Sequence, residues 1–127
     1  MSVLQKYPLR AYIPAKDLER ARRFYENKIG LKPRDVTLGG VYYEFGGGTA
    51  CFLYPTAGAG TSKASQAFWD VDDLEAAIRE LEKRGVQFED YDMPGMKTVN
   101  HVFEGGGAKA AWFKDSEGNI MALVQTV

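Results

Sequence analysis

The sequence has one cysteine, one histidine and almost no excess of charge, and each shortage excludes a class of protein. Because Cys51 has no second cysteine to pair with, no intrachain disulfide is possible, and we expect a cytoplasmic protein. The 16 Lys and Arg residues nearly balance the 17 Asp and Glu residues, which gives a formal net charge of −1. The basic residues are also spread along the chain, so we expect neither nucleic acid nor a membrane as a partner.

Long apolar runs are missing as well. No segment reaches the ~20 apolar residues that a transmembrane helix needs, and residues 1–10 hold no stretch typical of a signal peptide. The glycine triplets Gly46–Gly48 and Gly105–Gly107 are not followed by Lys-Ser or Lys-Thr, which excludes a phosphate-binding P-loop. With 127 residues, 45% of them hydrophobic, the chain predicts a single domain over residues 1–127.

One sequence pattern occurs twice. Residues 14–21 return in similar form at residues 70–77, and each copy follows a strand-like run. Each copy also opens a segment whose apolar residues recur every three or four positions, as in an amphipathic helix. Asp17 is a suitable N-cap in the first copy, and Asp72 or Asp73 in the second. The repeat therefore predicts two helices in equivalent places.

Strand-like runs surround both predicted helices. They cover residues 9–13, 32–38, 41–45 and 49–54 in the first half, and residues 66–71, 86–91, 109–114 and 120–125 in the second. The predicted organisation is two β-α-β-β-β modules, over residues about 7–56 and 64–127. The second copy is longer than the first, and the extra residues lie within 91–108, where we expect a lid or a pocket wall.

Three segments together resemble the vicinal oxygen chelate superfamily, which includes glyoxalases, bleomycin resistance proteins and extradiol dioxygenases. These segments are residues 17–31, residues 71–77 and residues 111–120. The resemblance implies an α+β fold of two βαβββ modules, with curved mixed sheets that enclose a cavity and helices on the outer faces. It also implies a tendency to form a homodimer.

The metal enzymes of this superfamily commonly hold a divalent cation with four side chains in that cavity. The residues at the corresponding positions of this chain are Arg10, Phe52, Gln66 and Ala122. Such a site needs imidazole and carboxylate ligands, and of these four residues only Gln66 could offer an oxygen. We therefore expect no metal and no cofactor, which favours the metal-free branch that contains the bleomycin-type drug-binding proteins.

Strand alternation places the candidate ligand-binding residues on common strand faces, which the resemblance turns into the cavity. These residues are Arg10, Tyr12, Phe52, Tyr54, Gln66 and Phe68, with His101 and Trp112 as further candidates for the pocket lining. Arg10 would supply a fixed cation for an anionic or planar ligand. Alternatively, Arg10 would pair with a carboxylate such as that of Glu44, and the aromatic rings would fill the core.

Three hypotheses on function follow. The first is a metal-independent protein that binds or sequesters an anionic or aromatic metabolite or drug. The second is a lyase, isomerase or dioxygenase-like enzyme with a non-standard site that uses Arg10, Tyr12 and the only histidine, His101. The third is a degenerate pocket in a protein that associates with a partner. The sequence favours the first hypothesis and assigns no catalytic residue.

Overall fold

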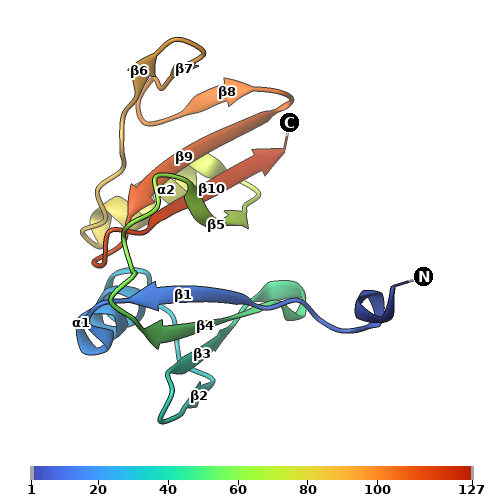
Figure 1. Ribbon diagram of the computed structural model, residues 1–127. Helices are drawn as coiled ribbons and strands as arrows, with labels where there is room; N and C mark the ends of the chain where they lie inside the picture. Colours follow the sequence, from blue (N-terminus) through green and yellow to red (C-terminus); the bar gives the residue numbers. More distant parts are fainter. Residues whose placement is uncertain (1, 127) are drawn as a thin grey trace.

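Two four-stranded mixed sheets dominate the computed structural model, which describes residues 2–126 (Figure 1). Sheet one has the strand order β1-β4-β3-β2 and sheet two the order β5-β10-β9-β8. β1 runs parallel to β4 and β5 runs parallel to β10, and the other neighbouring strands are antiparallel. The predicted α+β class with two mixed sheets is confirmed.

The strands of sheet one are β1 (Ala11–Ala15), β2 (Asp35–Val36), β3 (Val41–Glu44) and β4 (Ala50–Pro55). Those of sheet two are β5 (Ser65–Asp70), β8 (Phe103–Gly105), β9 (Ala108–Lys114) and β10 (Ile120–Thr126). β1 continues through Pro14 to Ala15. It is an edge strand, where the missing N–H of a proline is tolerated.

Aspartate side chains begin both main helices, as the repeated pattern predicts. Asp17 Oδ1 accepts a hydrogen bond from the Arg20 N–H at 3.1 Å before α1 (Leu18–Arg23), and Asp73 Oδ1 accepts one from the Ala76 N–H at 3.1 Å before α2 (Leu74–Lys83). α1 continues directly into a π-helical turn, η2 (Phe24–Lys28). Short 3-10 turns occupy Val3–Lys6 (η1) and Gly46–Gly48 (η3).

The helix-covered sides of the two sheets meet in one core. The ring of Phe24 lies 6.2 Å from that of Phe113 in β9, and the ring of Phe45 lies 5.8 Å from that of Trp69 in β5. The helices consequently lie at the junction of the two sheets, whereas the resemblance placed them on the outer faces (Figure 1). The opposite side of each sheet faces away from this junction.

The predicted strand over residues 86–91 is wrong. Val86 and Phe88 are buried, but only one bridge, between Phe88 and Phe113, joins this segment to sheet two. The carboxylate of Asp90 explains the departure of the chain, because its Oδ1 accepts hydrogen bonds from the hydroxyl of Thr98 at 3.0 Å and the N–H of His101 at 3.1 Å. The residues after it form a hairpin of β6 (Asp92–Met93) and β7 (Met96–Lys97).

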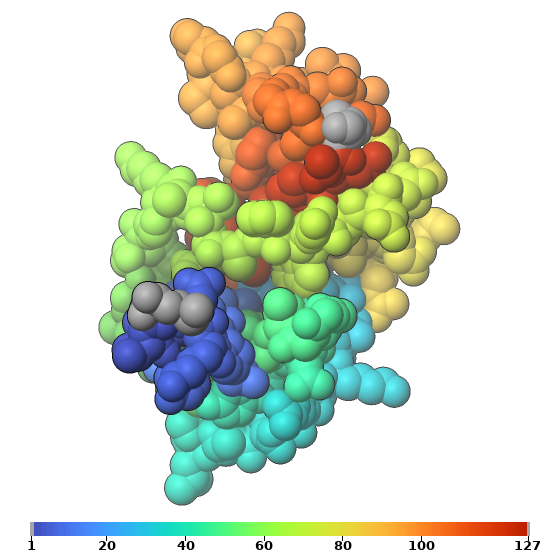
Figure 2. Space-filling view, turned by 90° about the vertical axis from the view of Figure 1, so that its right-hand side faces the viewer, coloured from blue at the N-terminus to red at the C-terminus, as the bar shows by residue number. Residues whose placement is uncertain are grey.

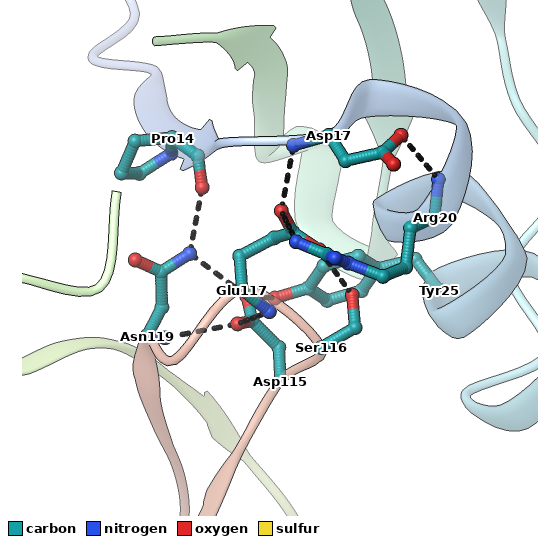
Figure 3. A network of polar contacts seen from close by, with 8 residues as sticks. All are labelled: Pro14, Asp17, Arg20, Tyr25, Asp115, Ser116, Glu117 and Asn119. Atoms are coloured by element: carbon teal, nitrogen blue, oxygen red, sulfur yellow. Dashed lines mark hydrogen bonds and ion pairs between the residues drawn. The ribbon is translucent and has the colours of Figure 1, made fainter. Parts of the chain in front are cut away.

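The β9–β10 turn fastens the second half of the chain to the first (Figure 3). The hydroxyl of Tyr25 donates to Asp115 Oδ2 at 2.6 Å, and Asn119 Nδ2 donates to the carbonyl of Pro14 at 2.7 Å. Asp115 also accepts hydrogen bonds from the backbone N–H groups of Glu117 and Asn119, both at 2.9 Å, which fix the shape of the turn. Burial and the adjacent Asp115 raise the pKa of Tyr25 well above its usual value, so its hydroxyl stays a donor.

Glu117 is the charged residue at the centre of the contacts between the β9–β10 turn and the first half of the chain. Its carboxylate accepts hydrogen bonds from Arg20 Nε at 2.8 Å, from the Asp17 N–H at 2.8 Å and from the Ser116 hydroxyl at 2.8 Å. Burial would raise the pKa of Glu117, but these donors outweigh burial and lower the pKa to about 2. Glu117 is therefore an anion at every pH at which the protein is expected to work.

Candidate ligand-binding site

A cavity of about 620 Å³ lies between the two sheets. Residues of β1, β4, β5 and β10 line it, and no residue of α1 or α2 does. Figure 2 looks onto its mouth, where the N-terminal segment (blue), the turn after β3 (green-cyan) and β5 (yellow-green) meet. The wall from sheet one includes Ala11, Ile13 and Cys51, and the wall from sheet two includes Ala67, Trp69 and Met121. These residues lie on the same strand sides as the core, so the cavity continues the core outward.

The chemistry of the cavity is mainly apolar. Its volume falls within the ~300–1,000 Å³ that small-molecule sites commonly have. Burial raises the pKa of the Cys51 thiol to about 11, so this residue contributes a neutral, apolar surface. Among residues 2–126, Arg10 and Asp70 are the only charged residues that line it. An apolar molecule of drug size would fit these walls.

The structure divides the predicted ligand-binding residues among four places. Arg10 and Phe68 line the cavity, although 63% of Phe68 remains exposed. Gln66 joins the two edge strands, because its Nε2 lies 3.4 Å from the carbonyl oxygen of Tyr12.

A second group, Tyr12, Phe52 and Tyr54, forms an aromatic cluster with Tyr42 on the side of sheet one that faces away from the core. The ring of Tyr12 lies 4.9 Å from that of Tyr54 and 6.1 Å from that of Phe52, and the ring of Phe52 lies 4.6 Å from that of Tyr42. None of the four lines the cavity. We call this cluster the aromatic face.

Trp112 and His101 lie elsewhere in the second half. The ring of Trp112 packs 5.7 Å from that of Tyr91 and 6.3 Å from that of Phe103. His101 packs against Phe88, and its Nδ1 lies 2.9 Å from Asp90 Oδ2, at a distance for an ion pair but without the geometry of a hydrogen bond. Neither residue lines the cavity.

The four residues that the resemblance assigns to metal-ligand positions do not suit a divalent cation. Arg10 is a cation, Phe52 belongs to the aromatic face, and Ala122 carries only a methyl group. Across residues 2–126, no group of three or more His, Cys, Asp and Glu side chains is arranged to hold a metal ion. The donor set available here therefore differs in kind from the imidazole and carboxylate sets that bind such ions.

The cavity also includes residues that the sequence analysis missed, notably Leu9, Phe45, Trp69, Asp70 and Met121. Several of them alternate, on the same strands, with residues that the sequence predicts to bind a ligand. The signal of alternation was therefore present in the sequence, but the choice of the inward side came from the resemblance.

The fold agrees with a comparison to known families. The sequence model of the Glyoxalase/Bleomycin resistance protein/Dioxygenase superfamily matches residues 8–123, and the chain belongs to this superfamily. No curated protein sequence matches the chain. Within the described residues, no helix is both long enough and apolar enough to cross a membrane.

Solved structures with this fold are similar along almost the whole chain. UcmS2 is 18% identical, with a TM-score of 0.72, and the match covers 92% of this chain and 96% of that one. TnmS3, described as an antibiotic binding protein from Streptomyces sp. CB03234, is 22% identical, with a TM-score of 0.69 and coverage of 100% and 99%. A glyoxalase/bleomycin resistance protein/dioxygenase from Alicyclobacillus acidocaldarius is 17% identical, with a TM-score of 0.72 and coverage of 95% and 92%. At these identities the comparison establishes the fold alone.

Proposed function

We propose that this protein is a metal-independent small-molecule-binding protein, which binds or sequesters an aromatic or anionic metabolite or drug in the cavity between its sheets. The observation that carries the proposal is the apolar cavity of about 620 Å³ with Arg10 at its lining. The unsuitable donors at the four metal-ligand positions support metal independence. The antibiotic-binding protein among the structural neighbours supports a ligand of this kind. His101 does not line the cavity, so no observation favours the enzyme hypothesis that uses it.

A homodimer is part of the same proposal. The aromatic face and its surroundings leave large apolar side chains in contact with water, including Tyr12 at 63% exposure and Leu9 at 94%. Apolar patches of this kind are typical of interfaces, and a second copy of the chain would cover them. A cytoplasmic location also belongs to the proposal, because a lone, buried thiol suits a reducing compartment.

Native mass spectrometry of the protein, purified without chelator or added metal, tests the assembly and the metal independence together. We expect a metal-free dimer, with any bound organic molecule visible as an added mass. One transition metal ion per chain would overturn metal independence, and a monomer at micromolar concentration would overturn the homodimer.

A blocking substitution tests the cavity itself. Gly46 lines the mouth, has ordinary backbone angles, and has no atom within 4 Å of the position of an added Cβ. Gly46→Trp should therefore fold normally and fill the mouth. Gly58→Trp is the matched control, because Gly58 also has ordinary backbone angles, is exposed and does not line the cavity.

The fluorescent probe dansylamide, which is apolar and neutral at pH 7, reports the result of this substitution. It should bind the wild-type protein and the Gly58→Trp variant and should bind Gly46→Trp much more weakly. Equal binding by all three proteins would mean that the cavity is not the binding site.

A further inference from the structure

We propose that the cavity selects amphoteric ligands, in which an apolar body carries both an anionic and a cationic group. Arg10 binds the anion and Asp70 binds the cation. This inference rests on the proposed function and adds the ligand class that the site prefers. Asp70 thereby becomes a residue that determines specificity, a role that neither the repeat nor the resemblance assigns to it.

The directions of two edge strands bring Arg10 and Asp70 to the same end of the cavity. β5 is parallel to β10, and in Figure 1 β10 runs opposite to β1, so β5 and β1 run in opposite directions along the junction. Gln66, near the start of β5, contacts the carbonyl of Tyr12 in β1. Residues after 66 therefore lie beside residues before 12. Arg10, just before β1, and Asp70, at the end of β5, therefore lie at the same end of the cavity, and both residues line it.

Both charges lack a protein partner within the described part of the chain. No ion pair and no side-chain hydrogen bond of Arg10 or Asp70 occurs among residues 2–126. Glu44, which could have neutralised Arg10, is paired with Arg34 instead, through Nη1 at 3.0 Å. The Arg10 guanidinium and the Asp70 carboxylate therefore lie at the edge of an apolar cavity without a charged partner among the described residues.

The surroundings make this pair of charges selective. Aromatic and aliphatic walls, such as Phe45 and Met121, offer no hydrogen bonds to a charged group placed deeper in the cavity. A ligand therefore keeps its charged groups at the mouth, where Arg10 matches only an anion and Asp70 only a cation. A ligand with one charge gives one of these residues a partner and leaves the other without one.

Four dansyl probes with the same aromatic body test this inference. Dansylamide is neutral, dansylglycine is an anion, dansylcadaverine is a cation, and Nε-dansyl-lysine is a zwitterion at pH 7. Titration by fluorescence should give the tightest binding for Nε-dansyl-lysine. Because both charges are open to water, each matched charge should improve the affinity about three-fold over dansylamide, and the gain should shrink at high salt.

Substitutions assign the gain to each residue. Arg10→Gln should remove the preference for dansylglycine over dansylamide, and Asp70→Asn should remove the preference for dansylcadaverine over dansylamide. Arg10→Lys keeps the charge and should retain the preference for the anion. Asp72→Asn, an exposed neighbour outside the cavity, is the matched control for Asp70→Asn.

The two proposals fail in different ways. If dansylamide binds at the cavity mouth but the four probes have equal affinity, or if Arg10→Gln and Asp70→Asn change nothing, the inference of amphoteric ligands is overturned and the proposed function stands. If dansylamide binds Gly46→Trp as well as wild type, the cavity is not the site and both proposals are overturned.

Discussion

Replacing Glu117 with glutamine should cost the protein about 2 kcal/mol of unfolding free energy at pH 7. The pKa of Glu117 is lowered from 4.5 to about 2, which at 1.36 kcal/mol per pH unit corresponds to ~3.4 kcal/mol of preference for the charged form. The side chain of Arg20, its main partner, is 48% exposed, so water screens the pair and we reduce the expected effect. The amide of Glu117→Gln cannot accept from Arg20 and Asp17 as the carboxylate does.

The same reasoning fixes a dependence on pH. Because the folded-state pKa of Glu117 lies below the unfolded-state value, its contribution is complete above about pH 4.5 and is lost as the pH falls towards 2. Urea unfolding of the wild type should therefore show a stability that declines over this window. The Glu117→Gln variant should show a shallower decline.

The control is Glu75→Gln, which removes a half-buried ion pair with Lys109 in the second half. It should change the stability much less than Glu117→Gln does. A loss below about 0.5 kcal/mol for Glu117→Gln at pH 7, or an unchanged slope between pH 4.5 and 2, would refute the account of Glu117 as a buried, paired anion.

Three further predictions concern single side chains. Tyr25→Phe should lower the unfolding free energy by about 1.5 kcal/mol in urea, because Asp115 loses a hydrogen bond at a buried site; an unchanged midpoint would contradict this. Gly60→Ala should cost about 2 kcal/mol, since its φ is +73° and an added Cβ would lie 2.3 Å from the carbonyl oxygen of Glu117; a melting temperature equal to that of the wild type would show that the turn can move. Cys51, with its pKa raised to about 11, should react with Ellman's reagent at pH 8 about 100-fold more slowly in the native protein than in urea, and rapid native labelling would rule out the buried thiol.

Local signals in the sequence were sufficient for most of the fold. The aspartate caps and the period of the apolar residues act over a few positions, and the structure has both helices where the sequence predicts them. The predicted strand over residues 86–91 is wrong because its conformation depends on contacts between residues farther apart in the sequence. Its alternating apolar residues do become buried, but Asp90 bonds to Thr98 and His101, which no local pattern indicates.

The site was harder to predict because it depends on which side of each sheet turns towards the other sheet. Tyr12 and Ile13 are neighbours in β1, and their alternation says only that one is buried and the other is not. Their orientation relative to β5 follows from contacts such as that of Phe24 with Phe113, across most of the chain. Arg10 and Phe68 line the cavity although they alternate along the chain with the inward residues Ala11 and Ala67, which local alternation does not predict.

The contacts of the β9–β10 turn with the first half of the chain also determine when the protein can finish folding during synthesis. Tyr25 and Asp115 are 90 positions apart, and Pro14 and Asn119 are 105 positions apart. During synthesis, the first half of the chain therefore lacks these partners until nearly every residue has been made, and closing so large a loop is costly in entropy and slow. A chain that stops before residue 115 would consequently be destabilised near its N-terminus, because β1 and the start of α1 would lack the contacts that hold them in place.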